Sequence, residues 1–208
     1  MRTPALLIFK PDAAYRRAVR AALWHWLDER DDFTLTGLRW FHPPAELIEQ
    51  HYDFLKERPF FGWLVDFMSA LPVVVGELEA EPEDLERIRF DLGETQIQKA
   101  RPGSLRERYG IYGGVNCLHL SDSPETGEKE TALWSRYVKF EGVNSKGLAD
   151  SAGAPDHTYR LRSLAAQYSS GVHKQLAGER MLELLQEETD LGGDRLQIYS
   201  RIMLGAFE

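Results

Sequence analysis

Four short apolar runs are separated along the chain by stretches with the residue spacing of amphipathic helices. One run is rich in valine and another alternates apolar with polar residues, and both patterns are typical of β-strands. The runs cover residues 5–9, 33–41, 72–75 and 117–120. Because the helical stretches divide them into two split strand–helix–strand units, we predict an α+β fold with a four-stranded antiparallel sheet and helices packed on it.

The helical stretches fall into two groups. In the first part of the chain they are expected at residues 12–27, 45–55, 58–70, 83–90 and 124–134. Asp12 is the expected N-cap of the first helix, and residues 92–112, which contain several glycines, predict a long ordered loop.

The composition changes after Trp134. Residues 141–156 are rich in Gly, Ser, Asp and Ala and predict a linker. Further helices are expected at residues 157–168, 173–188 and 196–207. We therefore expect a domain of residues 1–134 and a mostly helical C-terminal extension of residues 135–208. The apolar stripes of the extension predict that it packs on the core or on a neighbouring subunit.

Charge and cysteine content narrow the classes of partner and compartment. The 208 residues carry a formal net charge of -8, which argues against non-specific binding to nucleic acid or to an anionic membrane surface. No stretch reaches the roughly 18 consecutive apolar residues of a membrane-spanning helix. Cys117 is the single cysteine, which excludes an intrachain disulfide and predicts a small buried residue. We expect a soluble, cytoplasmic protein.

One histidine, His119, stands at the end of the fourth expected strand, directly before a polar turn. A neutral imidazole is nucleophilic near pH 7 and can carry a phosphoryl group covalently. One ring nitrogen attacks while a partner fixes the other, so a carboxylate or carbonyl is expected nearby. Transfer also needs cations around the phosphates. A lone histidine at a strand end is more often structural, so the hypothesis depends on other segments.

Several motifs in the right order resemble the nucleoside diphosphate kinase family. The segments that carry the resemblance are 51–61, 92–95, 116–123 and 128–134, and it extends over about residues 5–134. It implies a ferredoxin-like core and an Mg²⁺-dependent enzyme. Such an enzyme passes the γ-phosphoryl group of a nucleoside triphosphate to a nucleoside diphosphate by ping-pong transfer through a phosphohistidine. It also implies a homo-oligomer.

The resemblance implies a role for each matching residue. His119 is the expected nucleophile, Glu130 orients its imidazole, and Lys10 completes the catalytic set. The phosphate contacts implied are Lys10, Tyr52, Arg89, Thr95 and Arg106. The nucleoside contacts implied are Phe60, Leu64 and Asn116, with Ser121 sharing the site. Stacking on Phe60 predicts weak base selectivity. Mg²⁺ is expected to be held mainly by nucleotide phosphates, with Asp122 helping through water.

Several features depart from the family pattern, among them Val115 in place of an arginine and Leu71 in place of a small residue. Leu120 stands where the family has glycine, Arg108 stands where it has aspartate, and the extension is unusually long. Strand alternation puts Cys117, His119 and Ser121 on one side and Leu120 on the other, so Leu120 is expected to face away from the site. Two alternatives stay open. One is a nucleotide-binding regulatory or interaction module with little turnover, and the other is a phosphotransferase with a different acceptor.

Overall fold

A five-stranded sheet of order β4–β1–β3–β2–β5 forms the centre of the computed structural model, which describes residues 1–207. Its strands are β1 (Thr3–Phe9), β2 (Phe33–Phe41), β3 (Val73–Ala80), β4 (Leu118–Leu120) and β5 (Gly142–Val143). Neighbours among the first four are antiparallel, as predicted. β5 pairs in parallel with β2, so the sheet is mixed. We did not predict β5, because two residues carry no strand pattern.

Strand β1 is the rigid support of the sheet. Its residues 5–9 are buried throughout, because β1 lies between β3 and β4 and is covered on both faces. Ile8 pairs with Val75 on one side and with His119 on the other. The short edge strand β4 is therefore fixed in register against the most buried strand of the molecule.

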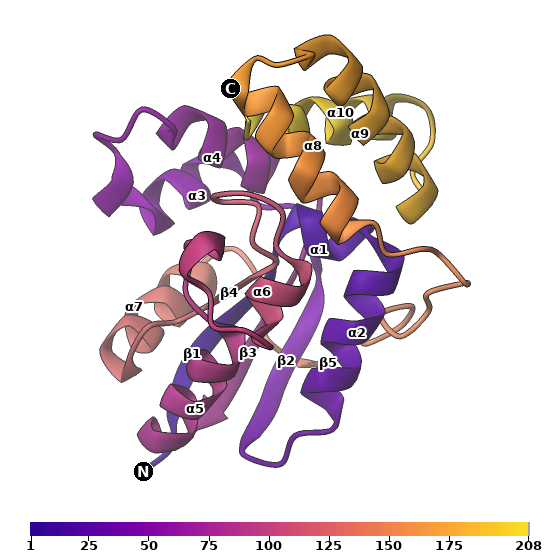
Figure 1. Ribbon diagram of the computed structural model, residues 1–208. Helices are drawn as coiled ribbons and strands as arrows, with labels where there is room; N and C mark the ends of the chain where they lie inside the picture. The colour runs from indigo at the N-terminus through magenta and orange to yellow at the C-terminus, as the bar shows by residue number, and fades with distance from the viewer. Residues whose placement is uncertain (208) are drawn as a thin grey trace.

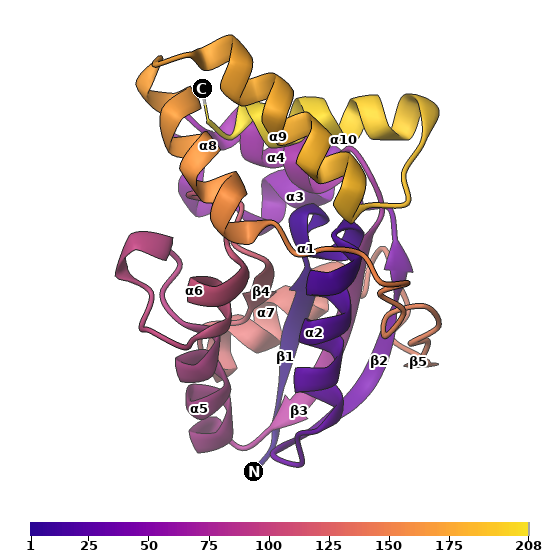
Figure 2. The same ribbon diagram turned by 45° about the vertical axis from the view of Figure 1, so that its right-hand side comes forward.

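Helices of the first part of the chain surround this sheet. They are α1 (Pro11–Tyr15), α2 (Arg17–Asp28), α3 (Ala45–His51), α4 (Phe61–Ser69), α5 (Pro82–Leu92), α6 (Leu105–Tyr109) and α7 (Pro124–Trp134). Short 3₁₀ turns lie at Asp53–Leu55 and Ile97–Lys99. Helix α2 lies in front of the sheet in both views (Figures 1 and 2). The expected loop 92–112 contains α6, which is too short to give a helical pattern in the sequence.

The single helix predicted over residues 12–27 is wrong in two respects. It begins at Pro11 with Lys10 as N-cap, because proline suits the first helical position, so Asp12 is not the cap. It is also broken at Arg16, whose ψ of 97° separates α1 from α2. The Arg16 side chain is fully buried and bound by partners from the other end of the chain, which no local pattern could reveal.

The extension forms three helices at the end of the molecule away from the N-terminus (Figures 1 and 2). They are α8 (Thr158–Ser170), α9 (Lys174–Glu188) and α10 (Gly193–Gly205). The apolar stripe of Met181, Leu184 and Leu185 on α9 is buried. Within residues 1–207, no helix is both long and apolar enough to cross a membrane.

Candidate active site

His119 is the middle residue of β4, and its imidazole is bound by helix α7. Nε2 of His119 lies 2.9 Å from Oε2 of Glu130, and the Ser121 hydroxyl donates to the same oxygen at 2.6 Å. The Ser121 oxygen accepts the backbone N–H of Leu6 at 2.8 Å, which ties the cluster to β1. The fold thus brings together three of the site residues expected from the sequence.

The charge on Glu130 decides which nitrogen of His119 can react. Burial by itself raises the pKa of Glu130, but the electrostatic effect of the neighbouring His119 and His51 imidazoles and the hydrogen bonds from His119 and Ser121 together lower it to about 2. Glu130 is therefore ionised near neutral pH and can only accept hydrogen bonds. Nε2 of His119 must then carry the proton, which leaves the lone pair of Nδ1 for nucleophilic attack.

His51 belongs to the same cluster, although it was not among the site residues expected from the sequence. Its ring centroid lies 4.6 Å from that of His119, and its Nε2 is 4.0 Å from Oε1 of Glu130. The indole N–H of Trp134 donates to Nδ1 of His51 at 3.2 Å. Burial, with a contribution from the neighbouring His119, lowers the pKa of His51 to about 3, so His51 is neutral. Its proton lies on Nε2, which faces Glu130 from beyond hydrogen-bond distance and has no hydrogen-bond partner within residues 1–207.

The same three side chains could be read as a metal site. Donor atoms of His51, His119 and Glu130 lie within 4.8 Å of one another. A metal bound to Nε2 of His51 would force the proton onto Nδ1, where it would face the Trp134 N–H. The cluster therefore fits a hydrogen-bond network better than a metal centre. The sequence did contain a signal for His51, since it stands directly before the expected site residue Tyr52 in the motif segment 51–61.

A strained turn leads into β4 and joins it to the start of α1. Cys117 is buried, as predicted, and has a φ of 74°, which non-glycine residues rarely adopt. Its N–H donates to Oδ2 of Asp12 at 2.9 Å, and its carbonyl accepts the Lys10 N–H at 2.8 Å. Such strain persists where the surroundings fix both ends of a residue. Cys117 is thus not part of the extended strand, and the alternation of side chains that we expected from Cys117 onward begins at Leu118.

The residues that depart from the family pattern stay out of the cluster. Leu120 pairs with Leu7 of β1 and is 2% exposed, so its side chain belongs to the core. Positive φ angles at non-glycine residues occur at Cys117, Ala152 and His173 within the described chain, so the Leu120 backbone needs no glycine. Arg108 is exposed on α6. Leu120 therefore faces away from the nucleophile, as expected from the sequence.

Lys10 and Asn116 lie beside the strained turn. Nζ of Lys10 donates to Oδ1 of Asn116 at 2.7 Å and to the carbonyl of Gly114 at 3.3 Å. The Asn116 amide donates to the carbonyl of Thr95 at 2.9 Å. Burial, with a contribution from the Arg106 charge, lowers the pKa of Lys10 to about 8. Lys10 is thus a buried cation whose charge an anionic ligand would stabilise.

Two arginines bind the backbone on either side of the histidine. Arg106 donates to the carbonyls of Gly93 at 2.8 Å and Leu118 at 2.7 Å. Arg89 donates to the carbonyl of Leu120 at 2.8 Å. Burial, with a contribution from the Arg89 charge, lowers the pKa of Arg106 to about 10, so Arg106 is charged near neutral pH. These bonds hold the guanidinium groups in place without a ligand.

A pocket of about 290 Å³ opens beside these cations. Arg89, Thr95 and Arg106 are among its lining residues, and the Thr95 hydroxyl accepts from Arg106 at 3.3 Å. Asp122, whose side chain is 73% exposed, pairs with Arg89 at 2.6 Å. With Arg101, the pocket therefore offers three arginines and a hydroxyl to an anionic group, while Glu86 and Glu94 also line it and the exposed Asp122 carboxylate lies next to Arg89.

The aromatic residues expected in the site differ in exposure. Tyr52 is buried with its ring 6.2 Å from that of His119, and its hydroxyl has no hydrogen-bond partner within residues 1–207. Phe60 is the N-cap residue of α4 and is 48% exposed. Leu64, one turn later, is only 4% exposed. Phe60 thus presents a free ring face, whereas Leu64 belongs to the core.

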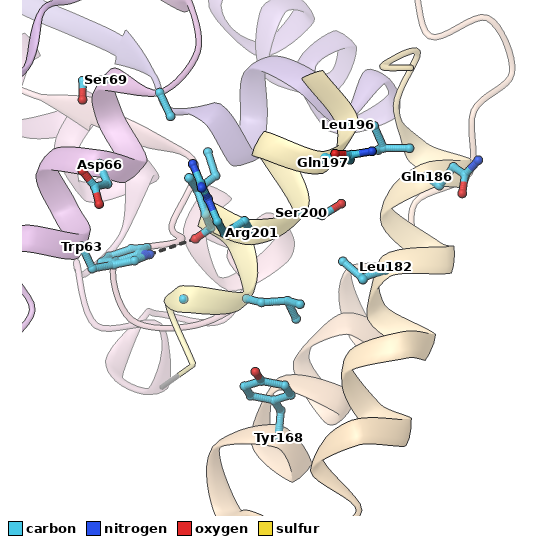
Figure 3. A pocket seen from close by; sticks show the side chains of 14 residues that line it. Trp63, Asp66, Ser69, Tyr168, Leu182, Gln186, Leu196, Gln197, Ser200 and Arg201 are labelled. Carbon is cyan, nitrogen blue, oxygen red and sulfur yellow. Dashed lines mark hydrogen bonds between the residues drawn. The ribbon is translucent and has the colours of Figure 1, made fainter. Parts of the chain in front are cut away.

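A larger pocket, of about 1080 Å³, lies away from this chemistry, between α4 and the extension (Figure 3). Trp63 and Asp66 line it from α4, and Leu182 lines it from α9. The Trp63 indole donates to the carbonyl of Ile202 at 2.8 Å, shown as the dashed line in Figure 3. None of the site residues expected from the sequence is among its lining residues, so volume alone does not locate the reacting groups.

Comparisons with known proteins identify the family. The family model described as nucleoside diphosphate kinase matches residues 3–139. The chain belongs to the nucleoside diphosphate kinase family. A nucleoside diphosphate kinase of Synechococcus sp. (strain CC9311) is 42% identical over 130 residues, covering 62% of this chain and 84% of that protein. One of Chloroflexus aurantiacus is 37% identical over 144 residues, covering 69% of this chain and 94% of the relative.

Solved nucleoside diphosphate kinases have the same fold. The Aquifex aeolicus enzyme matches with a TM-score of 0.56 and 36% identity, over 64% of this chain and 94% of its own. The Encephalitozoon cuniculi enzyme matches with a TM-score of 0.58 and 29% identity, over 68% and 94% respectively. The fold class, the enzyme class and the nucleoside diphosphate kinase function predicted from the sequence are thereby confirmed, and a phosphohistidine mechanism is general to this family.

Proposed function

We propose that His119 is the phosphoryl carrier of this nucleoside diphosphate kinase. The observation that carries the proposal is the hydrogen bond of Nε2 to Glu130, which leaves Nδ1 to attack. In the first half-reaction Nδ1 attacks the γ-phosphorus of the triphosphate. The bond from that phosphorus to the β–γ bridging oxygen breaks, and the nucleoside diphosphate leaves. A terminal oxygen of the acceptor diphosphate then attacks the phosphohistidine and frees the imidazole.

Lys10, Arg89 and Arg106 supply the positive charge around the transferring group. Catalysis of phosphoryl transfer is mainly positioning and charge stabilisation, and fixed cations stabilise the transition state without reorganising. The backbone carbonyls that hold both arginines support this role. Tyr52 and Thr95 donate hydroxyl hydrogen bonds to phosphate oxygens. The unpartnered Tyr52 hydroxyl near His119 supports its part.

Phe60 stacks on the nucleobase through its exposed ring face, and Leu64 supports the other edge of the base from the core. Asn116 binds the ribose, and Lys10 reaches from the phosphates to the sugar, as their mutual hydrogen bond supports. Ser121 completes the set by holding Glu130. A stacking face carries no hydrogen-bond code, so the base selectivity is weak.

Mg²⁺ would be held mainly by the phosphates of the nucleotide. At nucleotide sites this ion is bound through one or two carboxylates together with substrate phosphates, and it neutralises phosphate charge. The exposed Asp122 carboxylate, held beside the phosphate pocket by Arg89, fits that donor set and would help to hold the ion through water.

Three coarser features are part of the same proposal. Residues 1–134 form the catalytic domain and residues 135–208 an extension that packs on it, as the end of the family match at residue 139 supports. The chain assembles into a homo-oligomer, which light scattering after size-exclusion chromatography tests. Its compartment is the cytoplasm, which suits an enzyme of nucleotide metabolism with a single buried cysteine.

Initial-rate kinetics test the mechanism. With ATP and GDP varied together in Mg²⁺, the proposal expects parallel double-reciprocal lines and loss of exchange in His119→Ala. Intersecting lines would contradict a phosphohistidine intermediate. Nucleotide binding without exchange would favour the regulatory module. Phosphorylation of the enzyme that no nucleoside diphosphate discharges would favour a different acceptor.

A further inference from the structure

Helix α6 carries Arg106 yet is only 5 residues long. At its two ends the backbone is closed by hydrogen bonds to the flanking residues: the N–H of Arg108 donates to the carbonyl of Ser104, and the N–H of Gly110 donates to the carbonyl of Arg106, both at 3.0 Å. The last carbonyls of a helix have no partners within it. So short a helix therefore depends on groups from elsewhere to hold its C-terminal end.

Arg162 of α8 supplies such a group. Its Nε donates to the carbonyl of Gly110 at 2.7 Å, and its Nη2 donates to the carbonyls of Arg106, at 3.3 Å, and Glu107. The guanidinium is thus placed at the end of α6 where the helix dipole is negative. Arg162 lies in the extension, outside the family match over residues 3–139.

Arg16 binds another carbonyl at the same end. It donates to the carbonyl of Tyr109 at 2.9 Å. Arg16 is itself bound by Glu188 of α9 at 2.5 Å and by Asp156 at 3.2 Å. The extension therefore holds α6 twice, directly through Arg162 and indirectly through Arg16.

The side chain of Arg106 reaches in the other direction. Its guanidinium binds the carbonyls of Gly93 and Leu118, and Leu118 directly precedes the nucleophile in β4. The residue is 5% exposed, so it has little freedom to adjust if its backbone shifts. Helix α6 thus links the extension to the phosphate pocket through Arg106. Its backbone carbonyl is bound by Arg162 of the extension, and its side chain is bound to the backbone beside the nucleophile.

We propose that Arg162 is a positioning residue for phosphoryl transfer: by binding the C-terminal carbonyls of α6, it holds Arg106 where the transferring group requires it. The inference rests on the phosphate role proposed for Arg106. Arg162 does not touch the nucleotide. A misplacement of about 1 Å can cost roughly 10²-fold in rate, and partial loosening of α6 costs less.

Steady-state kinetics of the full-length chain with ATP and GDP test this. Arg162→Ala is expected to lower kcat/KM about 10-fold, because the guanidinium of Arg106 is no longer held in position. Arg162→Lys keeps the positive charge but replaces the planar guanidinium with a single ammonium nitrogen, and its kcat/KM is expected to fall about 3-fold. Arg160→Ala, an exposed arginine of the same helix, is the matched control and is expected to keep the wild-type kcat/KM.

A double-mutant cycle separates positioning from general destabilisation. If Arg162 acts through Arg106, then Arg106→Ala and the double variant Arg106→Ala/Arg162→Ala have the same kcat/KM, since the Arg106 guanidinium that Arg162 positions is already absent. Arg195→Ala removes a 3.2 Å contact of α10 with the Tyr15 hydroxyl, elsewhere on the extension. This variant is expected to lower the melting temperature and leave kcat/KM unchanged.

Several results would overturn the proposal. They are wild-type kcat/KM in folded Arg162→Ala, an additive loss in the Arg106→Ala background, or an equal loss in Arg195→Ala. If circular dichroism shows Arg162→Ala unfolded, Arg162→Lys decides, and wild-type kcat/KM in that variant overturns the proposal. Failure of the proposed function would give a different result. The wild-type chain would then not exchange phosphoryl groups between ATP and GDP, or Arg106→Ala would have the same kcat/KM as the wild type.

Discussion

Arg16 and Glu188 are 172 positions apart, yet Nε of Arg16 lies 2.5 Å from Oε2 of Glu188 in an ion pair without solvent contact. The pair joins the break between α1 and α2 to the end of α9. Because both charges are buried, each depends on the other far more than a surface pair would. The extension is therefore anchored to the core by electrostatics as well as by apolar packing.

Glu188→Gln tests this anchor. The substitution removes the buried charge partner of Arg16 and leaves only Asp156, whose side chain is partly exposed, so it is expected to lower the free energy of unfolding by about 3–5 kcal/mol. Urea unfolding measures the change. Glu183→Gln, in an exposed pair with Arg180, is the matched control and is expected to change stability by less than about 1 kcal/mol. Equal effects of the two substitutions would contradict the anchoring role.

Glu130→Gln tests the tautomer assignment for His119. An amide can present an N–H as well as an oxygen to Nε2, so the histidine is no longer held with Nδ1 free. We expect the rate of phosphorylation by ATP in a single turnover to fall about 10²-fold, with little change in nucleotide affinity. A wild-type phosphorylation rate in this variant would show that Glu130 does not orient the nucleophile.

The pH dependence of kcat/KM tests Lys10. Its pKa in the free protein is lowered to about 8, so the lysine is charged below that pH and neutral above it. Since phosphate binding needs the charge, kcat/KM is expected to be full below pH 8 and to fall as pH rises through 8, because this ratio reports groups of the free enzyme. Lys10→Arg stays charged and should lack this alkaline limb, whatever its plateau. An unchanged limb in the variant would assign it to another group.

Phe60→Ala tests the stacking face. Base–aromatic stacking contributes about 1–3 kcal/mol, so KM is expected to rise about 10-fold, and to rise equally for ATP and GTP because any base can stack. Phe54→Ala is the control, since Phe54 is also exposed, at 77%. A rise confined to one base would mean that Phe60 takes part in hydrogen-bonded selection rather than simple stacking.

The strands and the cluster around His119 were predictable because they follow local patterns and motifs. The β-branched composition of Val73 and Val74 predicts the strand in which they lie. The contact between His119 and Glu130 was expected because both residues belong to motif segments that stand in the order of the family. Leu120 faces the core, as the alternation of a strand predicted. Each of these inferences needed only neighbours within a few positions, or a resemblance along the sequence.

The features that escaped prediction depend on contacts between distant residues. The break at Arg16 and the course of the extension follow from a pair that joins both ends of the chain. Helix α6 is too short for a periodic pattern and is held by Arg162. His51 is a single polar residue whose place beside His119 depends on the packing of α3 against α7.

Intact mass tests the central claim most directly. The chain is mixed with ATP and Mg²⁺, then with GDP, and His119→Ala is treated in parallel. We expect a gain of one phosphoryl group, about 80 Da, that GDP removes and that the variant lacks, because the intermediate is covalent. No gain by wild-type protein that still binds ATP, or an equal gain by His119→Ala, would contradict the account.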